Sequence, residues 1–133
     1  MRSRAFCVAA TAALALAGAT LPAAPATAAA SDCGPGQVCL FKDYDYKGQM
    51  LVVARFGLPH HDLKEDGFND VTSSVINNSA VGVRLHQDVW YGGKYIDVNA
   101  GERIADMSRV HIYNADGSYF GVNTFNDRTS STD

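Results

Sequence analysis

Residues 68–74 read FNDVTSS and residues 125–131 read FNDRTSS, so the two segments differ only at Val71 against Arg128. After the phenylalanine, each copy supplies one amide, one carboxylate and three hydroxyl side chains. Hard oxygen ligands of this kind suit Ca²⁺. An isolated copy would be interpreted as a turn whose side chains cap their own backbone. Two copies, each tied to a second repeated feature, favour a pair of calcium sites.

The second repeated feature precedes each copy, and its two instances are 45 residues apart. Its matched positions are Leu40, Asp43, Tyr46 and Gly48 in the first half, and Leu85, Asp88, Tyr91 and Gly93 in the second. Each segment has a ring residue, Phe41 or His86, followed five positions later by the tyrosine and two further on by the glycine. Glycine accepts a positive φ, so the pattern predicts a β-hairpin that folds over while the first ring packs across it.

Short runs rich in β-branched and aromatic residues lie between these landmarks and predict strands. The predicted strands are 38–42, 49–55, 73–77, 81–86 and 95–99. Within 81–86, the alternation of Val81, Val83 and Leu85 with Gly82, Arg84 and His86 predicts one buried face and one wet face. Residues 57–67 are a polar connection.

We call residues 68–74 and 125–131 the two FND segments. Between its hairpin and its FND segment, the second half contains 12 more residues than the first. Residues 110–113 and 118–122 alternate in polarity on either side of Asp116-Gly117, which is the signal of a further hairpin. A twofold repeat of short antiparallel strands predicts an all-β fold, in which two Greek-key units close one β-sandwich.

Taken together, these motifs resemble the βγ-crystallin superfamily in its microbial calcium-binding branch. The pattern Phe41-x4-Tyr46-x-Gly48 is similar to the family's hairpin motif, and residues 69–74 and 126–131 match its Asn/Asp-Asn/Asp-x-x-Ser/Thr-Ser calcium signature at every specified position. The resemblance covers about residues 33–131. It implies a βγ-crystallin-like sandwich with two Ca²⁺ sites.

The resemblance also implies that the two sites share ligands crosswise. Each ion is expected to take a carbonyl and a hydroxyl from one motif, a carboxylate from the other, and a hairpin carbonyl. The first set is Val71, Ser73, Asp127 and Lys42, and the second is Arg128, Ser130, Asp70 and Gln87. Asn69 and Asn126 orient the loops or touch the metal. With one carboxylate per ion, we expect an affinity of about 10⁻⁶ to 10⁻³ M, as in extracellular modules.

The N-terminus predicts export. Arg2 and Arg4 precede an apolar, alanine-rich run over residues 5–21, and residues 26–28 read ATA, the small-x-small pattern of a signal peptidase site. We expect residues 1–30 to be a signal peptide, cleaved after Ala28 or Ala30, and residues 31–133 to be a single secreted domain. No later stretch is apolar for long enough to cross a membrane.

Removal of the signal leaves Cys33 and Cys39 as an even pair, because Cys7 lies within residues 1–30. An oxidising compartment lets such a pair close into a disulfide around the Gly34-Pro35-Gly36 turn. A zinc site would need more ligands, and the sequence contains no second Cys pair.

Several other classes of function are disfavoured by charge and spacing. Residues 31–133 contain 9 basic and 14 acidic groups, which disfavours binding to nucleic acid phosphates. The EF-hand-like start at Asp43 fails because its twelfth position is Ala54 rather than a bidentate acid. His60-His61 lack the spacing of a zinc helix, and no set of nucleophile, base and orienting residue indicates an enzyme.

The resemblance extends to secreted actinobacterial metalloproteinase inhibitors of the same fold, and implies an extracellular metalloproteinase as partner of a monomer. The alternative is a toxin-like or cell-surface interaction module that uses exposed aromatic residues. Its candidates are Trp90, Tyr91, Tyr113 and Tyr119, although Tyr91 is expected to pack over its hairpin.

Two departures from the family pattern lead to further expectations. His86 stands where an aromatic ring is usual, and we expect it to be structural. The sequence ends two residues after Ser131, whereas the first unit continues through Val75 and Ile76 into a strand. The second unit is therefore expected to lack its closing strand, which the inserted hairpin replaces, a partner chain donates, or truncation has removed.

Overall fold

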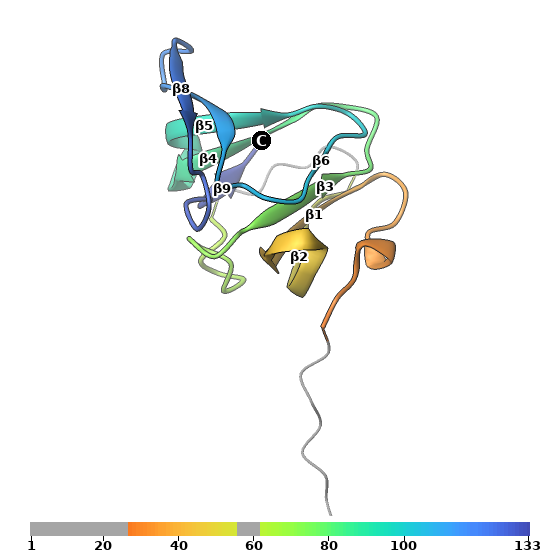
Figure 1. Ribbon diagram of the computed structural model, residues 1–133. Helices are drawn as coiled ribbons and strands as arrows, with labels where there is room; N and C mark the ends of the chain where they lie inside the picture. The colour runs from red at the N-terminus through yellow and green to blue at the C-terminus, as the bar shows by residue number, and fades with distance from the viewer. Residues whose placement is uncertain (1–26, 56–61) are drawn as a thin grey trace, which may run out of the picture.

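The computed structural model describes residues 27–55 and 62–133, and it confirms the predicted all-β fold. Two antiparallel sheets lie on opposite sides of the molecule (Figure 1). Sheet A has the order β2-β1-β3-β6, formed by β1 (Gln37–Asp43), β2 (Lys47–Arg55), β3 (Ser74–Asn77) and β6 (Arg103–Ile104). Sheet B has the order β8-β7-β5-β4-β9, formed by β4 (Val83–Asp88), β5 (Gly92–Val98), β7 (Val110–Tyr113), β8 (Tyr119–Asn123) and β9 (Ser131–Thr132).

The helical content of the described residues is limited to three short 3₁₀ turns, η1 (Ala30–Asp32), η2 (Tyr44–Tyr46) and η3 (Val89–Tyr91). No helix within these residues is long and apolar enough to span a bilayer. Residues 1–26 of the predicted signal peptide lie outside the described residues, as do His60 and His61.

The two halves of the sequence are interlocked. β6 belongs to the second half but pairs with β3 of the first half, at Val75↔Ile104 and Ile76↔Arg103. The predicted inserted hairpin is present as β7 and β8, which pair antiparallel from Val110↔Asn123 onward. Neither β6 nor β9 was predicted, because each has only two residues and so carries no period.

The expectation that the second unit lacks a closing strand is wrong. β9 pairs with β4 at Leu85↔Thr132 and His86↔Ser131. Asp133 extends this pairing, because its N–H donates to the Arg84 carbonyl at 3.1 Å and its carbonyl accepts from the Arg84 N–H at 2.9 Å. In the first half β3 pairs with β1 in the corresponding way, starting at Phe41↔Ser74. The last serine of each FND segment therefore begins the closing strand.

The main hydrophobic core lies between the sheets and receives apolar side chains from both. Its fully buried or nearly buried members are Val38, Leu40, Val53, Leu63, Phe68, Val75, Val83, Leu85, Ile96, Val98, Met107, Val110, Ile112 and Phe125. The phenylalanine that opens each FND segment is almost completely inaccessible. Burial of such a ring stabilises the fold by about 1.5–3 kcal/mol, so each segment is fixed to the core at its first residue.

The predicted alternation in residues 81–86 is wrong at its two ends. Val81 is exposed because β4 begins only at Val83. His86 is buried rather than wet, because the rings of Tyr91 and Tyr95 lie against it, with centroids 5.7 and 5.8 Å away. Aromatic residues thus cover part of the outer face of sheet B, which a period of two cannot reveal.

A smaller apolar cluster covers the other face of sheet A. It contains Cys33, Cys39, Phe41 and Ile76, with Ala28 and Ala30 packed against them. Cys33 and Cys39 form the predicted disulfide. The Ala28 N–H donates to the Gly48 carbonyl at 2.8 Å, so the described N-terminal residues lie against the first hairpin.

Candidate functional site

The tips of the two hairpins have the same backbone geometry. Residues 45 and 46 have φ values of 56° and 59°, and residues 90 and 91 have 57° and 62°. Gly48 and Gly93 follow with φ of 78° and 73°. A Cβ added to Gly48 would lie 2.5 Å from Asp43 Oδ2, and one added to Gly93 would lie equally close to Asp88 Oδ2. Glycine is therefore required at both positions by conformation and by space.

The ring contact predicted for each hairpin is confirmed. The Phe41 and Tyr46 rings meet edge to face with centroids 5.9 Å apart, and His86 and Tyr91 meet at 5.7 Å. Loss of contact with water raises the pKa of the Tyr46 and Tyr91 hydroxyls above their ordinary values, so both side chains stay neutral.

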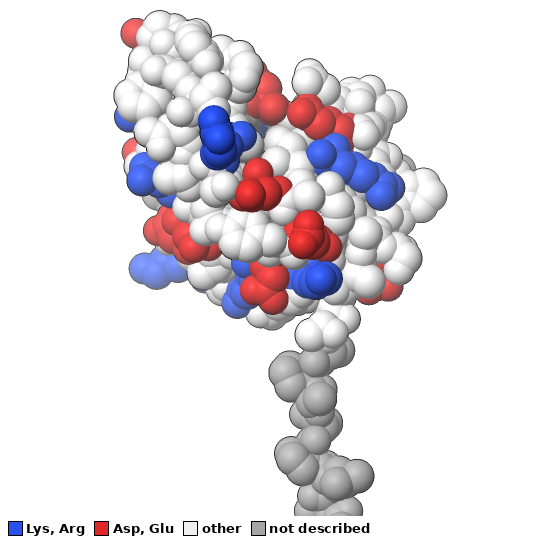
Figure 2. Space-filling view, viewed as in Figure 1, with Lys and Arg blue, Asp and Glu red and all other residues white. Residues whose placement is uncertain are grey.

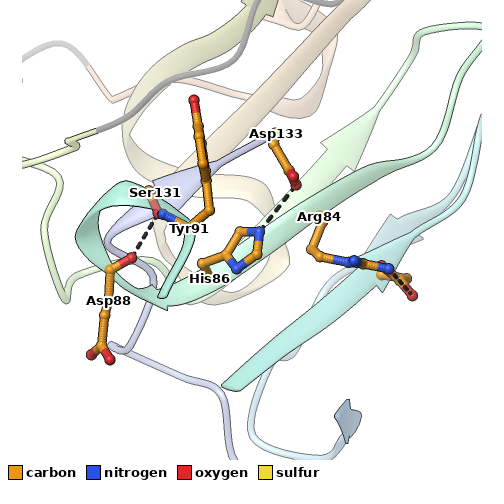
Figure 3. Close-up of polar contacts among 7 residues, drawn as sticks. Arg84, His86, Asp88, Tyr91, Ser131 and Asp133 are labelled. Atoms are coloured by element: carbon orange, nitrogen blue, oxygen red, sulfur yellow. Dashed lines mark hydrogen bonds and ion pairs between the residues drawn. The ribbon is translucent and has the colours of Figure 1, made fainter. Parts of the chain in front are cut away.

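The last serine of each FND segment joins the segment to its hairpin. The Ser74 hydroxyl donates to the Asp43 carbonyl at 2.6 Å and accepts from the Tyr46 N–H at 3.0 Å. The Ser131 hydroxyl makes the same two bonds, to the Asp88 carbonyl at 2.6 Å and from the Tyr91 N–H at 3.0 Å (Figure 3). Each buried serine thus holds the backbone on both sides of a hairpin tip.

The two FND segments lie against each other, and their side chains are in contact. The Ser73 hydroxyl lies 3.5 Å from Asp127 Oδ1, and the Ser130 hydroxyl lies 3.2 Å from Asp70 Oδ1. Each hydroxyl therefore meets the carboxylate of the other segment. The family resemblance implies the same pairs, Ser73 with Asp127 and Ser130 with Asp70, as ligands of one ion each; the structure brings the pairs together, and their coordination of an ion stays a prediction.

Backbone hydrogen bonds fix the two segments against each other. The Asp70 N–H donates to the Thr129 carbonyl at 3.0 Å, and the Asp127 N–H donates to the Thr72 carbonyl at 2.9 Å. Both aspartates have a left-handed backbone, with φ of 53° and 52°. Asp is one of the few side chains that adopt this conformation readily, so the residue type fits the backbone at both positions.

The asparagine of each segment orients the neighbouring aspartate. Asn69 Nδ2 donates to Asp70 Oδ2, and Asn126 Nδ2 donates to Asp127 Oδ2, both at 2.7 Å. Asn126 Oδ1 is buried and has no hydrogen-bond partner. A buried oxygen without a partner is costly, so this amide oxygen is available to a cation, as the sequence analysis allowed for Asn126.

The donor set of the paired FND segments fits Ca²⁺. Each of the two serine–aspartate pairs contains one carboxylate and one hydroxyl. Within the described residues, no three His, Cys, Asp or Glu side chains converge on one point. The remaining ligands would have to be carbonyl and water oxygens. An all-oxygen set of this kind suits Ca²⁺ and does not suit Zn²⁺, which prefers nitrogen and sulfur.

The four predicted carbonyl ligands belong to residues that occupy equivalent positions in the two halves of the sequence. The Ser73 N–H donates to the Phe41 carbonyl at 2.9 Å and the Ser130 N–H to the His86 carbonyl at 2.8 Å. Lys42 and Gln87 directly follow those two carbonyls, and Val71 and Arg128 each lie two residues before the paired serine. Coordination through the carbonyls of these four residues stays a prediction.

His86 is structural, as expected. Its Nε2 lies 3.0 Å from Asp133 Oδ1, and its side chain is almost fully buried (Figure 3). The pair links β4 to the residue that follows β9, next to the backbone bonds between Arg84 and Asp133. Figure 3 also shows that Arg84 points away from this group, toward its ion pair with Asp97 at 2.8 Å.

Three of the four aromatic residues proposed as a recognition patch belong to one run of ring contacts, which leads from Tyr91 through His86 and Tyr95 to Tyr113 and Tyr119. Tyr113 stacks on Tyr95, with centroids 5.5 Å apart, and Tyr119 meets Tyr113 at 5.8 Å. Trp90 is the most exposed large apolar residue of the described chain, with 70% of its surface accessible, and it lies at the tip formed by η3. Tyr91 packs on His86 of its own hairpin, as predicted.

Sequence reasoning missed the role of Ser74 and Ser131, which it treated only as part of the metal signature. Both positions are the last residue of the repeated segment, and both are fully buried. Their identity in the two copies was the available signal. Their partners are backbone atoms 31 and 43 residues away, which a sequence pattern cannot locate.

Comparison with known proteins gives one matching family and several similar solved structures. The model of peptidase inhibitor family I36 matches residues 26–98. A βγ-crystallin from Ciona intestinalis is similar in structure, with 25% identity and a TM-score of 0.54, over 73% of this chain and 96% of that chain. A search of curated protein sequences gave no significant match.

Two further solved structures are similar in fold. One comes from work on the evolution of the eye-lens βγ-crystallin domain fold, with 20% identity and a TM-score of 0.60, over 80% of this chain and 92% of that chain. The other is a βγ-crystallin from an archaeon, with 18% identity and a TM-score of 0.53, over 74% and 96% of the two chains. The fold is therefore the βγ-crystallin Greek-key sandwich.

Proposed function

The chain belongs to peptidase inhibitor family I36, and from that premise we propose that it is a non-enzymatic peptidase inhibitor stabilised by two bound Ca²⁺ ions. The observation that carries the inhibitor role is the match to the family model over residues 26–98. This region contains the disulfide, the first hairpin, the first FND segment and the second hairpin. The preferred target is a metallopeptidase, which is the class that the sequence resemblance implies.

Calcium binding is the second part of the proposal, and the crosswise contacts support it. Ser73 with Asp127 and Ser130 with Asp70 bring one hydroxyl and one carboxylate together on each side. Asn126 contributes a buried amide oxygen that has no other partner. The ion would supply positive charge beside the two carboxylates, which in its absence accept hydrogen bonds from the serine hydroxyls.

Calcium would act on stability rather than on chemistry. An ion bound between the segments joins residues that lie 54 or 60 positions apart in the sequence. By linkage, a ligand present at about 100 times its dissociation constant adds about 2.7 kcal/mol per site to the free energy of unfolding. Such a gain matters for a small domain that has to survive among peptidases.

Secretion belongs to the same proposal. Its support is the leader pattern of residues 1–30 and the Cys33–Cys39 disulfide, which persists in oxidising compartments. Edman sequencing of the exported protein should give an N-terminus at Ala29 or Ser31. An unprocessed N-terminus in the culture medium would contradict the predicted cleavage.

The inhibitor role is tested by titrating a fixed amount of a thermolysin-type metallopeptidase with the purified mature protein in the presence of Ca²⁺. We expect residual activity to fall linearly and to end near equimolar inhibitor. A subtilisin-type serine peptidase, assayed in parallel, measures selectivity. Full activity of both enzymes at a large molar excess of the protein would overturn the inhibitor role.

The calcium role is tested separately, because chelators also inactivate metallopeptidases. Isothermal titration of the metal-free protein with CaCl₂ should show two sites. Inhibition by an Asp70→Asn/Asp127→Asn double variant, measured at constant Ca²⁺, then shows whether inhibition needs the ions. A protein that binds no Ca²⁺ but inhibits the peptidase would remove only the calcium part of the proposal.

A further inference from the structure

A polar cleft of about 520 Å³ lies between β5, β6 and β7. It forms because β5 and β7 pair at only one position, Tyr95↔Tyr113, and then separate. The chain leaves β6 in sheet A and has to cross to sheet B before β7 can begin. The cleft is therefore a product of the inserted β7–β8 hairpin. In the first half, the strand that corresponds to β5 is β2, which is an edge strand of its sheet.

The connection from β6 to β7 is held firmly, so the cleft is formed in advance. The Ala105 carbonyl accepts from the Asp45 N–H at 2.9 Å, and the Met107 N–H donates to the Ser73 carbonyl at 3.1 Å. The Met107 carbonyl accepts from the Phe125 N–H at 2.8 Å, and the Met107 side chain is fully buried. These bonds anchor the wall to both FND segments and to the core.

The acidic side chains of the cleft are each engaged within the protein. Asp97 forms an ion pair with Arg84 at 2.8 Å. Glu102 Oε2 accepts from the N–H and the side-chain amide of Asn99, at 2.7 and 2.9 Å. Each carboxylate keeps further lone pairs that can accept hydrogen bonds from a ligand.

The donors of the cleft are less occupied. Arg103 Nη2 donates to the neutral Asn78 Oδ1 at 3.3 Å. Within the described residues, the Arg109 and His111 side chains make no hydrogen bond or ion pair, although the His111 ring lies 5.8 Å from that of Tyr119. Tyr113 also lines the cleft, and the ring of the exposed Tyr119 lies against it, with centroids 5.8 Å apart.

The charge balance of the cleft selects the class of ligand. Acidic and basic groups are interspersed along its walls, and Figure 2 shows the same mixture, without a patch of one sign, on the face in view. A polyanion would meet the carboxylates, and a cation would meet the guanidinium groups.

We propose that this cleft binds an uncharged oligosaccharide. Sugar hydroxyls donate to carboxylates and accept from guanidinium and imidazole groups, so one ligand can bind both the acidic and the basic side chains of the cleft. The apolar face of a sugar ring can also pack beside the Tyr113 ring, which lines the cleft and has Tyr95 stacked on one of its faces. The volume of the cleft lies within the range of about 300–1,000 Å³ that is typical of small-ligand sites. The proposal is independent of peptidase inhibition.

The test uses the full mature protein and three neutral trisaccharides: cellotriose, maltotriose and the trimer of N-acetylglucosamine. We expect at least one of them to bind in isothermal titration and to shift the amide NMR signals of residues around Arg109 and His111. Arg109→Ala should weaken that binding at least about tenfold, because hydrogen bonds to charged groups are the stronger class. A sulfated trisaccharide of the heparin type serves as the anionic probe.

Lys64→Ala is the matched control, because it removes one exposed positive charge outside the cleft. It should leave trisaccharide affinity and the melting temperature unchanged, and Arg109→Ala should leave the melting temperature unchanged. Three results would overturn the proposal: no neutral trisaccharide binds at millimolar concentration, the two variants lose affinity equally, or only the sulfated probe binds and loses its affinity in high salt.

Discussion

Ser130 and Asp70 lie 60 residues apart in the sequence, yet the serine hydroxyl is only 3.2 Å from the aspartate Oδ1. Ser73 and Asp127 form the corresponding pair at 3.5 Å. The contact therefore occurs twice, related by the internal repeat, and in each case it joins the two halves of the molecule. A cation that draws these groups together would close the molecule at two points.

The calcium sites are tested by Asp70→Asn and Asp127→Asn, made singly. Asparagine removes the negative charge but accepts the left-handed backbone of both positions, so the fold should survive. We expect each variant to lose one of two sites in isothermal titration, because each site has only one carboxylate. In saturating Ca²⁺ each should lose about 2.7 kcal/mol of stability at 100 times the dissociation constant.

Glu65→Gln provides the control for these variants, since it removes one exposed carboxylate outside the paired segments. Its calcium isotherm should match that of the unchanged protein. Two intact sites in both aspartate variants, or equal melting temperatures of the unchanged protein in chelator and in millimolar Ca²⁺, would refute the assignment.

The hairpin locks are tested by Ser74→Ala and Ser131→Ala. Each change removes a buried hydroxyl that bonds to a backbone carbonyl at 2.6 Å and a backbone N–H at 3.0 Å. We expect a loss of roughly 1–3 kcal/mol for each variant in urea unfolding, because buried backbone groups are left without partners. Ser31→Ala, at an exposed position, should change stability by less than about 0.5 kcal/mol. Similar results for all three would show that these serines do not lock the hairpins.

The disulfide is tested by the Cys33→Ala/Cys39→Ala double variant. The bridge spans six positions, and closure of so short a loop is expected to contribute about 2 kcal/mol through the unfolded chain. The cysteines lie in the smaller cluster on the outer face of sheet A, away from the paired FND segments. Calcium stoichiometry should therefore stay at two. Loss of a calcium site in this variant would show that the two regions are coupled.

A pH effect is expected at the turn between β6 and β7. Hydrogen bonds from the Ser108 hydroxyl and N–H hold the pKa of Asp106 below its ordinary value of about 3.9. Because the folded pKa is lowered, the stabilisation is present above the unfolded pKa and is lost as the pH falls through the folded pKa. Ser108→Ala should raise the Asp106 pKa in an NMR titration of carboxyl carbons.

Asp116 provides an internal reference for that titration. Its pKa is also lowered, by hydrogen bonds from Ser118 in the β7–β8 hairpin. It should keep its value in the Ser108→Ala variant. An Asp106 pKa that does not move, or an equal movement at both residues, would contradict a local effect of Ser108.

Much of the candidate site could be predicted because its chemistry is local and repeated. The FND segments contain the oxygen-bearing side chains of the candidate site. The hairpin repeat predicts a positive φ at two glycines, Gly48 and Gly93, as the structure has it. The crossed pairing of Ser73 with Asp127 came from the family resemblance and agrees with the contact observed. The burial of His86 could not be predicted, because it depends on the rings of Tyr91 and Tyr95.

The sequence alone determined the features that depend on neighbours along the chain: the long strands, the hairpin tips, the disulfide pair and the oxygen-rich segments. Only the tertiary structure decided that β6 crosses to the first sheet, that β9 and Asp133 close the second, and that a polar cleft opens beside β5. The physical reason is that a two-residue strand has no detectable period, and its partner is selected by distant backbone groups that need hydrogen bonds.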